Sequence, residues 1–455
     1  MTTSAARANT PGPPGSLITL LTSASRDPLG FFLDLQAHYG DIVAFRGGKG
    51  YFVARPEGIK HVLQDNHPNY VKGEHYRRAV RPLRGDGLTG VDGAQWRMQR
   101  HLAQPAFLRK QHEFFAATIV GKIRLLCQRF LDAAANKNRL DLQEEVARSS
   151  LDIILELIFG EDLGGMTEEL ASAFLVAEHE SDLVSVFVPI RLPQWVPTRS
   201  HLRFRKSLRI LDDFVFETIR RRREKNSDRG DLLSMYLRAR DEETGQSLSD
   251  KLVRDEMVTL MSAGRAPTAD AIAWTFYLLI THPDVYDRVC DETDSVVGDQ
   301  VPTLSTIGSM PLSTMVLQEA LRLYPPIWGF LRIAESEDEI CGHAIAAGSR
   351  IFLLPYVMHR HPGIWEAPNQ FVPERFLPEQ VAQRHRFAWF PFGAGPHQCL
   401  GAGLAMLEAQ ITLAMLTRAV RLELIAGQQI GCLPRTTLKP SGPIWVQPHA
   451  RHQAQ

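Results

Sequence analysis

A short glycine-rich segment around Cys399 contains the residue best suited to metal chemistry. Cysteine binds metals as the thiolate, and a free thiol is mostly protonated at neutral pH. An apolar helical pattern runs from Gly401 to Val420, so a helix is predicted to begin directly after the cysteine. Free N–H groups and the positive dipole end of a helix N-terminus stabilise a thiolate. The segment therefore favours a thiolate at Cys399, and the alternative is a buried structural cysteine in a tight turn.

The spacing in this segment is Phe392-x-x-Gly395-x-His397-x-Cys399-x-Gly401, which resembles the haem-binding loop of the cytochromes P450. The resemblance implies haem b as cofactor, with Cys399 as the axial iron ligand. A thiolate ligand pushes electron density onto the iron and favours O–O cleavage. His397, where the family more often has arginine, would donate a hydrogen bond to a haem propionate. The implied fold is mainly α with small β-sheets (α+β), as in the cytochromes P450.

Further cofactor contacts are expected from a predicted helix that contains Trp96 and Arg100. Their i, i+4 spacing places both side chains on one face of the helix. In the family such a pair binds a haem propionate, and arginine supplies the charge-assisted bonds that a buried carboxylate needs. The resemblance assigns a second propionate contact to Arg332. The alternative for the helix is an ordinary amphipathic surface element.

A structural ion-pair network is expected from Glu319, Arg322 and Arg375, which resemble the Glu-x-x-Arg motif of the family and its later arginine. The spacing alone has no specificity, because it recurs at other pairs: Glu74 and Arg77, Glu145 and Arg148, Glu217 and Arg220. Glu319 is selected because a Tyr-Pro-Pro turn and the cysteine segment follow it. Loss of one member of a buried network leaves a stranded charge, so these residues are assigned to folding and haem retention.

A long helix is predicted over residues 251–281, where the family places its distal haem helix. Most members have an acid followed by an alcohol there, and this pair relays protons to oxygen. Here the two positions hold Ala266 and Pro267, followed by Thr268, and neither alanine nor proline carries a proton. Three replacements remain open: Thr268 or ordered water, a hydroxyl or carboxyl of the substrate, or peroxide as the oxidant. Pro267 is expected to kink the helix, because it removes a hydrogen bond to Ala263.

The substrate pocket is expected to be apolar, since the residues assigned to it by their place relative to the family motifs are mostly apolar. The alternative for each is simple core packing. The assigned residues are Leu88, Phe187, Met261, Ala263, Ile327, Trp328, Phe330 and Leu438.

Bulk properties exclude several classes. The chain has 455 residues, with 51 Lys+Arg and 51 Asp+Glu, so nothing indicates a nucleic-acid partner. The cysteines number 5 and are widely spaced, which fits neither a disulfide framework nor a zinc site. No signal sequence or long apolar run indicates a membrane anchor, and a cytoplasmic, soluble protein is expected.

The predicted organisation is a flexible tail over residues 1–15 and one catalytic domain over residues 16–455. A helix is expected over residues 27–39 and a β-hairpin over residues 41–54. Helical periodicity dominates from Pro56 to His282. Further strands are expected only near residues 350–355 and after Leu422.

The resemblance implies a monooxygenase that hydroxylates or epoxidises an apolar small molecule with O2. Electrons from NAD(P)H would arrive through a separate ferredoxin or flavodoxin-type partner, and the chain would act as a monomer. A role in secondary-metabolite biosynthesis, on terpenoids or polyketides, is the expectation. The alternatives are a peroxide-dependent or redox-neutral haem-thiolate enzyme and a non-catalytic haem-binding sensor.

Overall fold

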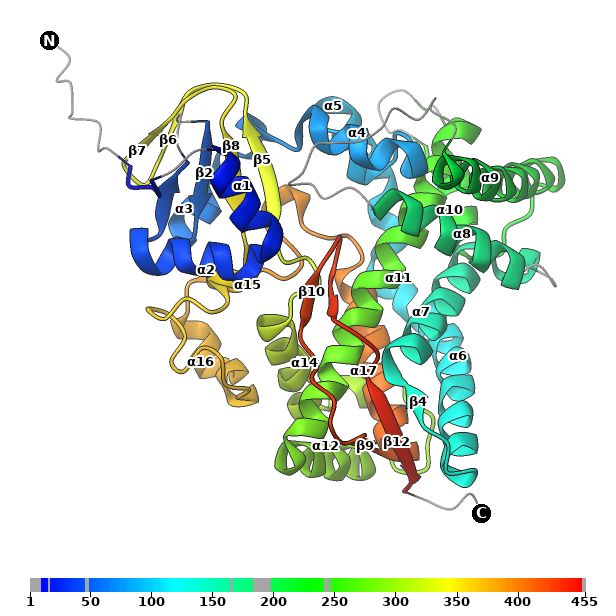
Figure 1. Ribbon diagram of the computed structural model, residues 1–455. Helices are drawn as coiled ribbons and strands as arrows, with labels where there is room; N and C mark the ends of the chain where they lie inside the picture. The colour runs from blue at the N-terminus through cyan, green and yellow to red at the C-terminus, as the bar shows by residue number, and fades with distance from the viewer. Residues whose placement is uncertain are drawn as a thin grey trace, which may run out of the picture.

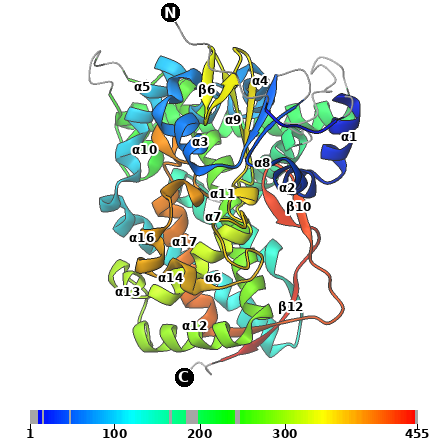
Figure 2. The same cartoon turned by 90° about the vertical axis from the view of Figure 1, so that its left-hand side faces the viewer.

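The architecture is mainly helical, with a small β-rich region at one edge (Figure 1, Figure 2). A computed structural model of the chain describes residues 10–14, 17–45, 49–163, 167–182, 198–240, 245 and 247–451. The expected mainly α fold with small sheets is therefore confirmed.

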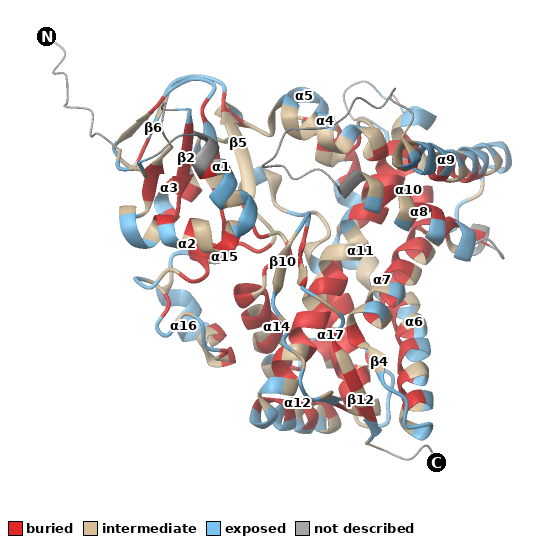
Figure 3. Ribbon diagram, in the orientation of Figure 1, coloured by how far each residue is buried: buried red, intermediate tan, exposed pale blue. Residues whose placement is uncertain are grey.

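The central element is helix α11 (Asp250–Thr281), which confirms the predicted long helix. Ser249 caps its N-terminus, because the side chain accepts a hydrogen bond from the backbone N–H of Leu252 at 3.2 Å. The helix continues through Pro267 and ends before Pro283. It packs against α7 (Leu142–Phe159), α14 (Pro311–Leu323) and α17 (Ala402–Ala419). Figure 3 shows that buried residues occupy much of α11 and α17, as expected for helices inside the core.

A five-stranded sheet forms the β-rich region, in the order β1-β2-β8-β5-β3. The predicted hairpin is confirmed as β1 (Ile42–Ala44) and β2 (Gly50–Val53). Strand β2 pairs in parallel with β8 (Arg350–Leu353), and β8 pairs antiparallel with β5 (Phe330–Ala334). Strand β3 (Tyr70–Val71) completes the edge.

The prediction of strands only near residues 350–355 and after Leu422 is wrong. Strand β5 and the hairpin of β6 (Asp338–Ile340) and β7 (His343–Ile345) lie before residue 350, and β3 and β4 (Leu140–Asp141) lie earlier still. Four successive side chains of β5 are half-buried, so the strand lacks the alternation that marks a one-sided sheet. Phe330, Leu331 and Arg332 line an internal cavity, which explains this pattern.

The remaining strands are short. Strands β4 (Leu140–Asp141), β12 (Trp445–Ala450) and β9 (Val420–Leu424) form a three-stranded sheet. Strands β10 (Cys432–Pro434) and β11 (Leu438–Pro440) form a hairpin. The other α-helices are α1 (Leu17–Arg26), α2 (Pro28–Tyr39), α3 (Pro56–Lys60), α4 (Gly73–Arg84), α5 (Gly93–Ala103), α6 (Arg109–Ala135), α8 (Thr167–Asp182), α9 (Arg199–Lys225), α10 (Leu232–Arg238), α12 (Pro283–Val296), α13 (Leu304–Gly308), α15 (Pro355–Met358) and α16 (Pro378–Gln383).

Residues 10–14 lie along β1, although the sequence places them in a flexible tail. The backbone N–H of Ala44 donates to the carbonyl of Pro11 at 2.8 Å. A Cβ on Gly12 would lie 1.9 Å from the carbonyl oxygen of Ala44, so the two segments are in close contact. Residues 1–9 and 15–16 lie outside the described residues.

Candidate active site

A large internal cavity contains most of the residues that the sequence selects for chemistry. Its volume is about 890 Å³, and its lining comes from α11, β5, the β10–β11 turn, and the segment from Pro391 to Ala409. Cys399 lines this cavity and exposes its side chain to it. The cavity therefore brings the predicted metal ligand next to the predicted distal helix.

The loop that carries Cys399 is held in shape by its own backbone. The Cys399 N–H donates to the carbonyl of Phe392 at 2.9 Å, and the Gln398 N–H donates to the carbonyl of Gly395 at 3.1 Å. Gly395 has a φ of 66°, and a Cβ there would lie 1.9 Å from the carbonyl oxygen of Leu63. Only glycine fits at this position. Because α17 begins at Ala402, the cysteine lies just before a helix N-terminus, as predicted.

The Gly401 N–H and Arg100 stabilise the thiolate form of Cys399, which burial disfavours. Burial raises the pKa of the Cys399 thiol, while a hydrogen bond from the Gly401 N–H and the charge of Arg100 lower it. Cys432 also lines the cavity, and burial raises its pKa to about 11 with only the charge of Arg360 opposing. Of the two cysteines that line the cavity, Cys399 alone has a backbone N–H that favours its thiolate.

Three cationic side chains line the same cavity without a carboxylate partner. Lys72 Nζ donates to the carbonyls of Leu88 and Val91 at 3.1 and 2.8 Å, and Arg100 Nη1 donates to the carbonyl of Gln398 at 2.6 Å. Arg332 donates to the carbonyl of Leu331. Within the described part of the chain, none of the three forms an ion pair.

These unpaired cations fit an anionic ligand. Burial lowers the pKa of Lys72 to about 8 and lowers the pKa values of Arg100 and Arg332. A bound anion would raise these pKa values again, because a nearby negative charge favours the charged form of each side chain. Haem carries two carboxylates and an iron that accepts thiolate, so this donor set fits haem.

His397 stacks on Trp96, with ring centroids 3.8 Å apart and an interplanar angle of 26°. Burial, Lys72 and Arg332 lower the pKa of His397 to about 3, so its ring is neutral at pH 7. A neutral ring still donates through one N–H. The structure thus brings together Trp96, Arg100, Arg332 and His397 around one cavity, as the sequence predicts.

The three residues of the predicted ion-pair network are in contact. Arg322 and Glu319 form a fully buried pair, with Nε and Oε2 2.6 Å apart, and Arg375 Nε lies 3.5 Å from Glu319 Oε1. Arg322 also donates to the carbonyls of three residues: His359, Pro368 and Gln370. Glu319 accepts a bond from the Val372 N–H at 2.9 Å. The network therefore ties α14 to the segment that leads toward the cysteine loop.

Comparison with known proteins identifies the family. The family model for cytochrome P450 matches residues 10–447. The chain belongs to the cytochrome P450 family. Its members are monooxygenases with a haem cofactor.

The curated proteins to which this P450 is similar include two bacterial enzymes. It is 32% identical over 404 residues to cyclooctat-9-en-7-ol 5-monooxygenase of Streptomyces melanosporofaciens, with 88% of this chain and 86% of the relative covered. It is 32% identical over 397 residues to pentalenene oxygenase of Streptomyces avermitilis, with 86% and 85% covered.

Among solved structures, the heme domain of cytochrome P450DA matches with a TM-score of 0.85 and 24% identity, and 97% of each chain is covered. That likeness shows the fold. No helix in the described ranges of this P450 is long and apolar enough to cross a membrane.

The residues at the predicted acid and alcohol positions of α11 lie at the cavity. Ala266, Pro267 and Thr268 all line the cavity. Arg265, the residue before them, pairs through Nη2 with Oε2 of Glu178 on α8. Glu178 also lines the cavity and is only 7% exposed. A carboxylate from another helix therefore pairs with the residue that precedes Ala266 and lines the same cavity.

Most predicted pocket residues of this P450 line the cavity, and two do not. Those that line it are Leu88, Ala263, Ile327, Trp328 and Phe330. Met261 and Leu438 were predicted wrongly, because both are 0% exposed and pack in apolar core clusters. Phe187 lies outside the described residues.

Sequence reasoning missed several charged residues of the cavity wall, among them Lys72 and Glu256. Neither belongs to a motif, and neither has a sequence neighbour that marks it as functional. Glu256 lies on α11, before Ala266 and Pro267, and is 1% exposed. Only the folded chain brings these two side chains to the same loop.

Proposed function

We propose that this P450 hydroxylates or epoxidises an apolar small molecule bound in the cavity at Cys399. Cys399 holds the iron of haem b, and Trp96, Arg100, Arg332 and His397 hold its propionates. Bound haem supplies the iron that activates O2. The single observation that carries the proposal is the largely apolar cavity whose wall holds three unpaired cations and Cys399, the thiol of which receives a hydrogen bond from the Gly401 N–H.

The source of electrons and the biological role belong to the same proposal. NAD(P)H-derived electrons arrive through a ferredoxin or flavodoxin-type partner, and residues 16–455 act as one catalytic domain of a cytoplasmic monomer. The bacterial relatives act, by their names, on cyclooctat-9-en-7-ol and pentalenene. These names support terpenoid substrates and secondary-metabolite biosynthesis as the first class to test.

A spin-state titration of the ferric protein tests the substrate class. Terpenes, fatty acids and polyketide-like lactones are added in turn. We expect a saturable low-to-high-spin shift with terpenes, because an apolar ligand that fills the cavity displaces water from the iron. The absence of a shift with all three classes would contradict a free apolar substrate.

Pro267→Thr tests the distal helix. Threonine restores a hydroxyl at the cavity wall and a backbone N–H in reach of the Ala263 carbonyl, so proton supply is expected to change while the cysteine loop stays intact. Product formed per NAD(P)H consumed should therefore change, whereas haem affinity should not. Equal coupling in variant and parent would place proton delivery elsewhere.

A peroxide-dependent enzyme is the second proposal, favoured by Ala266 and Pro267 in the cavity wall. It predicts turnover with hydrogen peroxide and substrate alone. Arg265 already pairs with Glu178, which opposes the use of this arginine to hold a substrate carboxylate. Turnover that requires a ferredoxin, a reductase and NAD(P)H would exclude this second proposal.

A further inference from the structure

One loop of the cavity wall is held through its backbone by two titratable side chains, Glu256 and Lys72. Leu88 lines the cavity, and its N–H donates to Glu256 Oε1 at 3.0 Å. Its carbonyl accepts from Lys72 Nζ at 3.1 Å, and the same ammonium binds the carbonyl of Val91 at 2.8 Å. Both backbone polar groups of this residue are thus bound by side chains from outside the loop, 168 and 16 residues away in the sequence.

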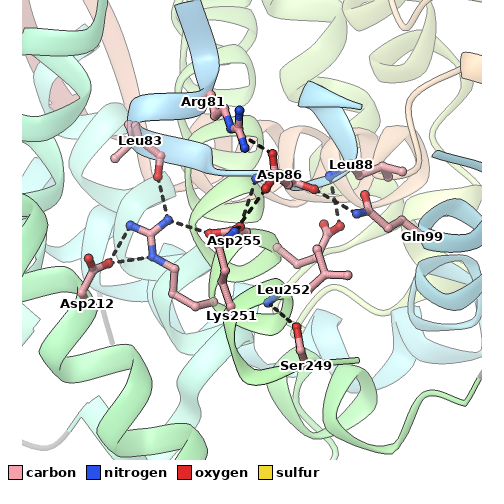
Figure 4. Close-up of polar contacts among 12 residues, drawn as sticks. Arg81, Leu83, Asp86, Leu88, Gln99, Asp212, Ser249, Lys251, Leu252 and Asp255 are labelled. Atoms are coloured by element: carbon pink, nitrogen blue, oxygen red, sulfur yellow. Dashed lines mark hydrogen bonds and ion pairs between the residues drawn. The ribbon is translucent and has the colours of Figure 1, made fainter. Parts of the chain in front are cut away.

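The preceding residue of the loop with a polar side chain, Asp86, is attached to the same helix. Its N–H donates to Asp255 Oδ2 at 3.0 Å, and its carbonyl accepts from Gln99 Nε2 at 2.9 Å. Lys251 Nζ bridges the Asp86 and Asp255 carboxylates at 3.2 and 2.8 Å. Figure 4 shows Asp86 and Leu88 beside α11, with Asp255 and Lys251 reaching from the helix to the loop.

Two glycines let the loop lie directly on α11. A Cβ on Gly85 would lie 2.2 Å from the Asp255 carboxylate, and Gly85 has a φ of 57°. A Cβ on Gly87 would lie 2.3 Å from Thr259 Oγ1 and 2.8 Å from the carbonyl oxygen of Asp255. No larger side chain fits at either place, so the loop can take this position only with glycine at residues 85 and 87.

Glu256 has no evident role other than this attachment. Its Oε2 atom has no hydrogen-bond partner within the described ranges, and Glu256 is 1% exposed. Burial raises its pKa to about 8, against the opposing charge of Lys72. Because a buried carboxyl is costly unless it is hydrogen-bonded, its bond to the Leu88 N–H is the feature that compensates for burial.

We propose that Glu256 and Lys72 are positioning residues that set the size selectivity of the cavity by fixing the backbone of Leu88. The fixed backbone holds the Leu88 side chain in the cavity wall. Large apolar ligands contact this side chain, whereas small ligands do not reach it. This inference rests on the proposed function, because it takes the cavity at Cys399 as the substrate site.

The test compares Glu256→Ala with Glu256→Gln in the haem-loaded protein. Imidazole and 1-phenylimidazole serve as probes, because both bind iron but only the second has a bulky apolar group. Glu256→Ala should change the ratio of the two dissociation constants by about tenfold, the effect expected from one lost hydrogen bond to a buried group. Glu256→Gln should restore the parent ratio, because its amide oxygen still accepts the Leu88 N–H.

A second variant guards against misfolding of the first. Gly87→Ala leaves Glu256 and Lys72 intact, and alanine is compatible with a helix-side loop whose residue 87 has a φ of −69°. Its Cβ would push the loop off Thr259, so the same change of ratio is expected. The haem spectrum and imidazole affinity should match the parent in every variant.

An unchanged ratio in both Glu256→Ala and Gly87→Ala would overturn the inference. Failure of Glu256→Gln to restore the parent ratio would also overturn it, because the hydrogen bond to the Leu88 N–H would then not determine the ratio. Failure of the proposed function is distinct, since the parent itself would then bind neither probe at an iron centre.

Discussion

Replacement of Cys399 by serine is expected to abolish oxygen insertion. The serine hydroxyl stays protonated at neutral pH, so under the proposed function the iron would lose the thiolate that pushes electron density toward O–O cleavage. The loop should keep its shape, because the Cys399 N–H bond to the Phe392 carbonyl involves only backbone atoms. Product formation with a shift-inducing substrate and haem content of the purified variant measure the effect.

Cys432→Ser is the matched control. Cys432 lines the same cavity, but burial raises its pKa to about 11 and no backbone N–H favours its thiolate. Its replacement should leave haem content and the nature of the iron ligand unchanged. Activity that survives Cys399→Ser, or disappears with Cys432→Ser, would contradict the assignment of the iron ligand.

Glu319→Ala is expected to lower the free energy of unfolding by roughly 3–5 kcal/mol. Glu319 and Arg322 are fully buried, and the change leaves the guanidinium of Arg322 without its counter-charge. The carbonyls of His359, Pro368 and Gln370 remain as partners but carry no charge to balance it. Urea unfolding of the haem-loaded protein, followed by the haem spectrum and by far-UV circular dichroism, measures the loss.

Glu217→Ala provides the comparison at identical sequence spacing. Glu217 pairs with Arg220 at 2.7 Å, but their side chains are 48% and 57% exposed. Exposed pairs contribute at most about 1 kcal/mol, so this variant should unfold nearly as the parent does. Equal losses in the two variants would show that burial does not determine the strength of the Glu319 network.

The cysteine loop and the long helices were predictable because their signals are local. Cys399 lies next to the start of α17, and α11 begins at a serine cap and ends before a His-Pro pair. The Glu319 network was predictable only from its place in the order of motifs, since Glu217 and Arg220 have the same spacing but form an exposed pair.

Which apolar residue faces the cavity was harder to predict, because apolar type does not distinguish a pocket from a core. Thr437 and Lys439 line the cavity, whereas Leu438 between them is buried in the core. Successive residues of a strand point to opposite faces, so a shift of one residue reverses the assignment. The prediction for Met261 on α11 was wrong because its side chain is buried in the apolar core.

The hydrogen bonds that hold the Leu88 backbone were not predictable, because they join residues from separate parts of the sequence. Glu256 lies on α11 and Lys72 precedes α4, and neither belongs to a motif. Only the folded structure brings the side chains of both residues to the backbone of Leu88.

The carbon monoxide difference spectrum of the reduced protein tests the central claim most directly. With Cys399 as the iron ligand, the parent and Cys432→Ser should give the strongly red-shifted Soret band of a thiolate-ligated haem. Cys399→Ser should lose that band. A parent spectrum with the Soret position of a histidine-ligated haem, or a red-shifted band that persists in Cys399→Ser, would contradict the claim.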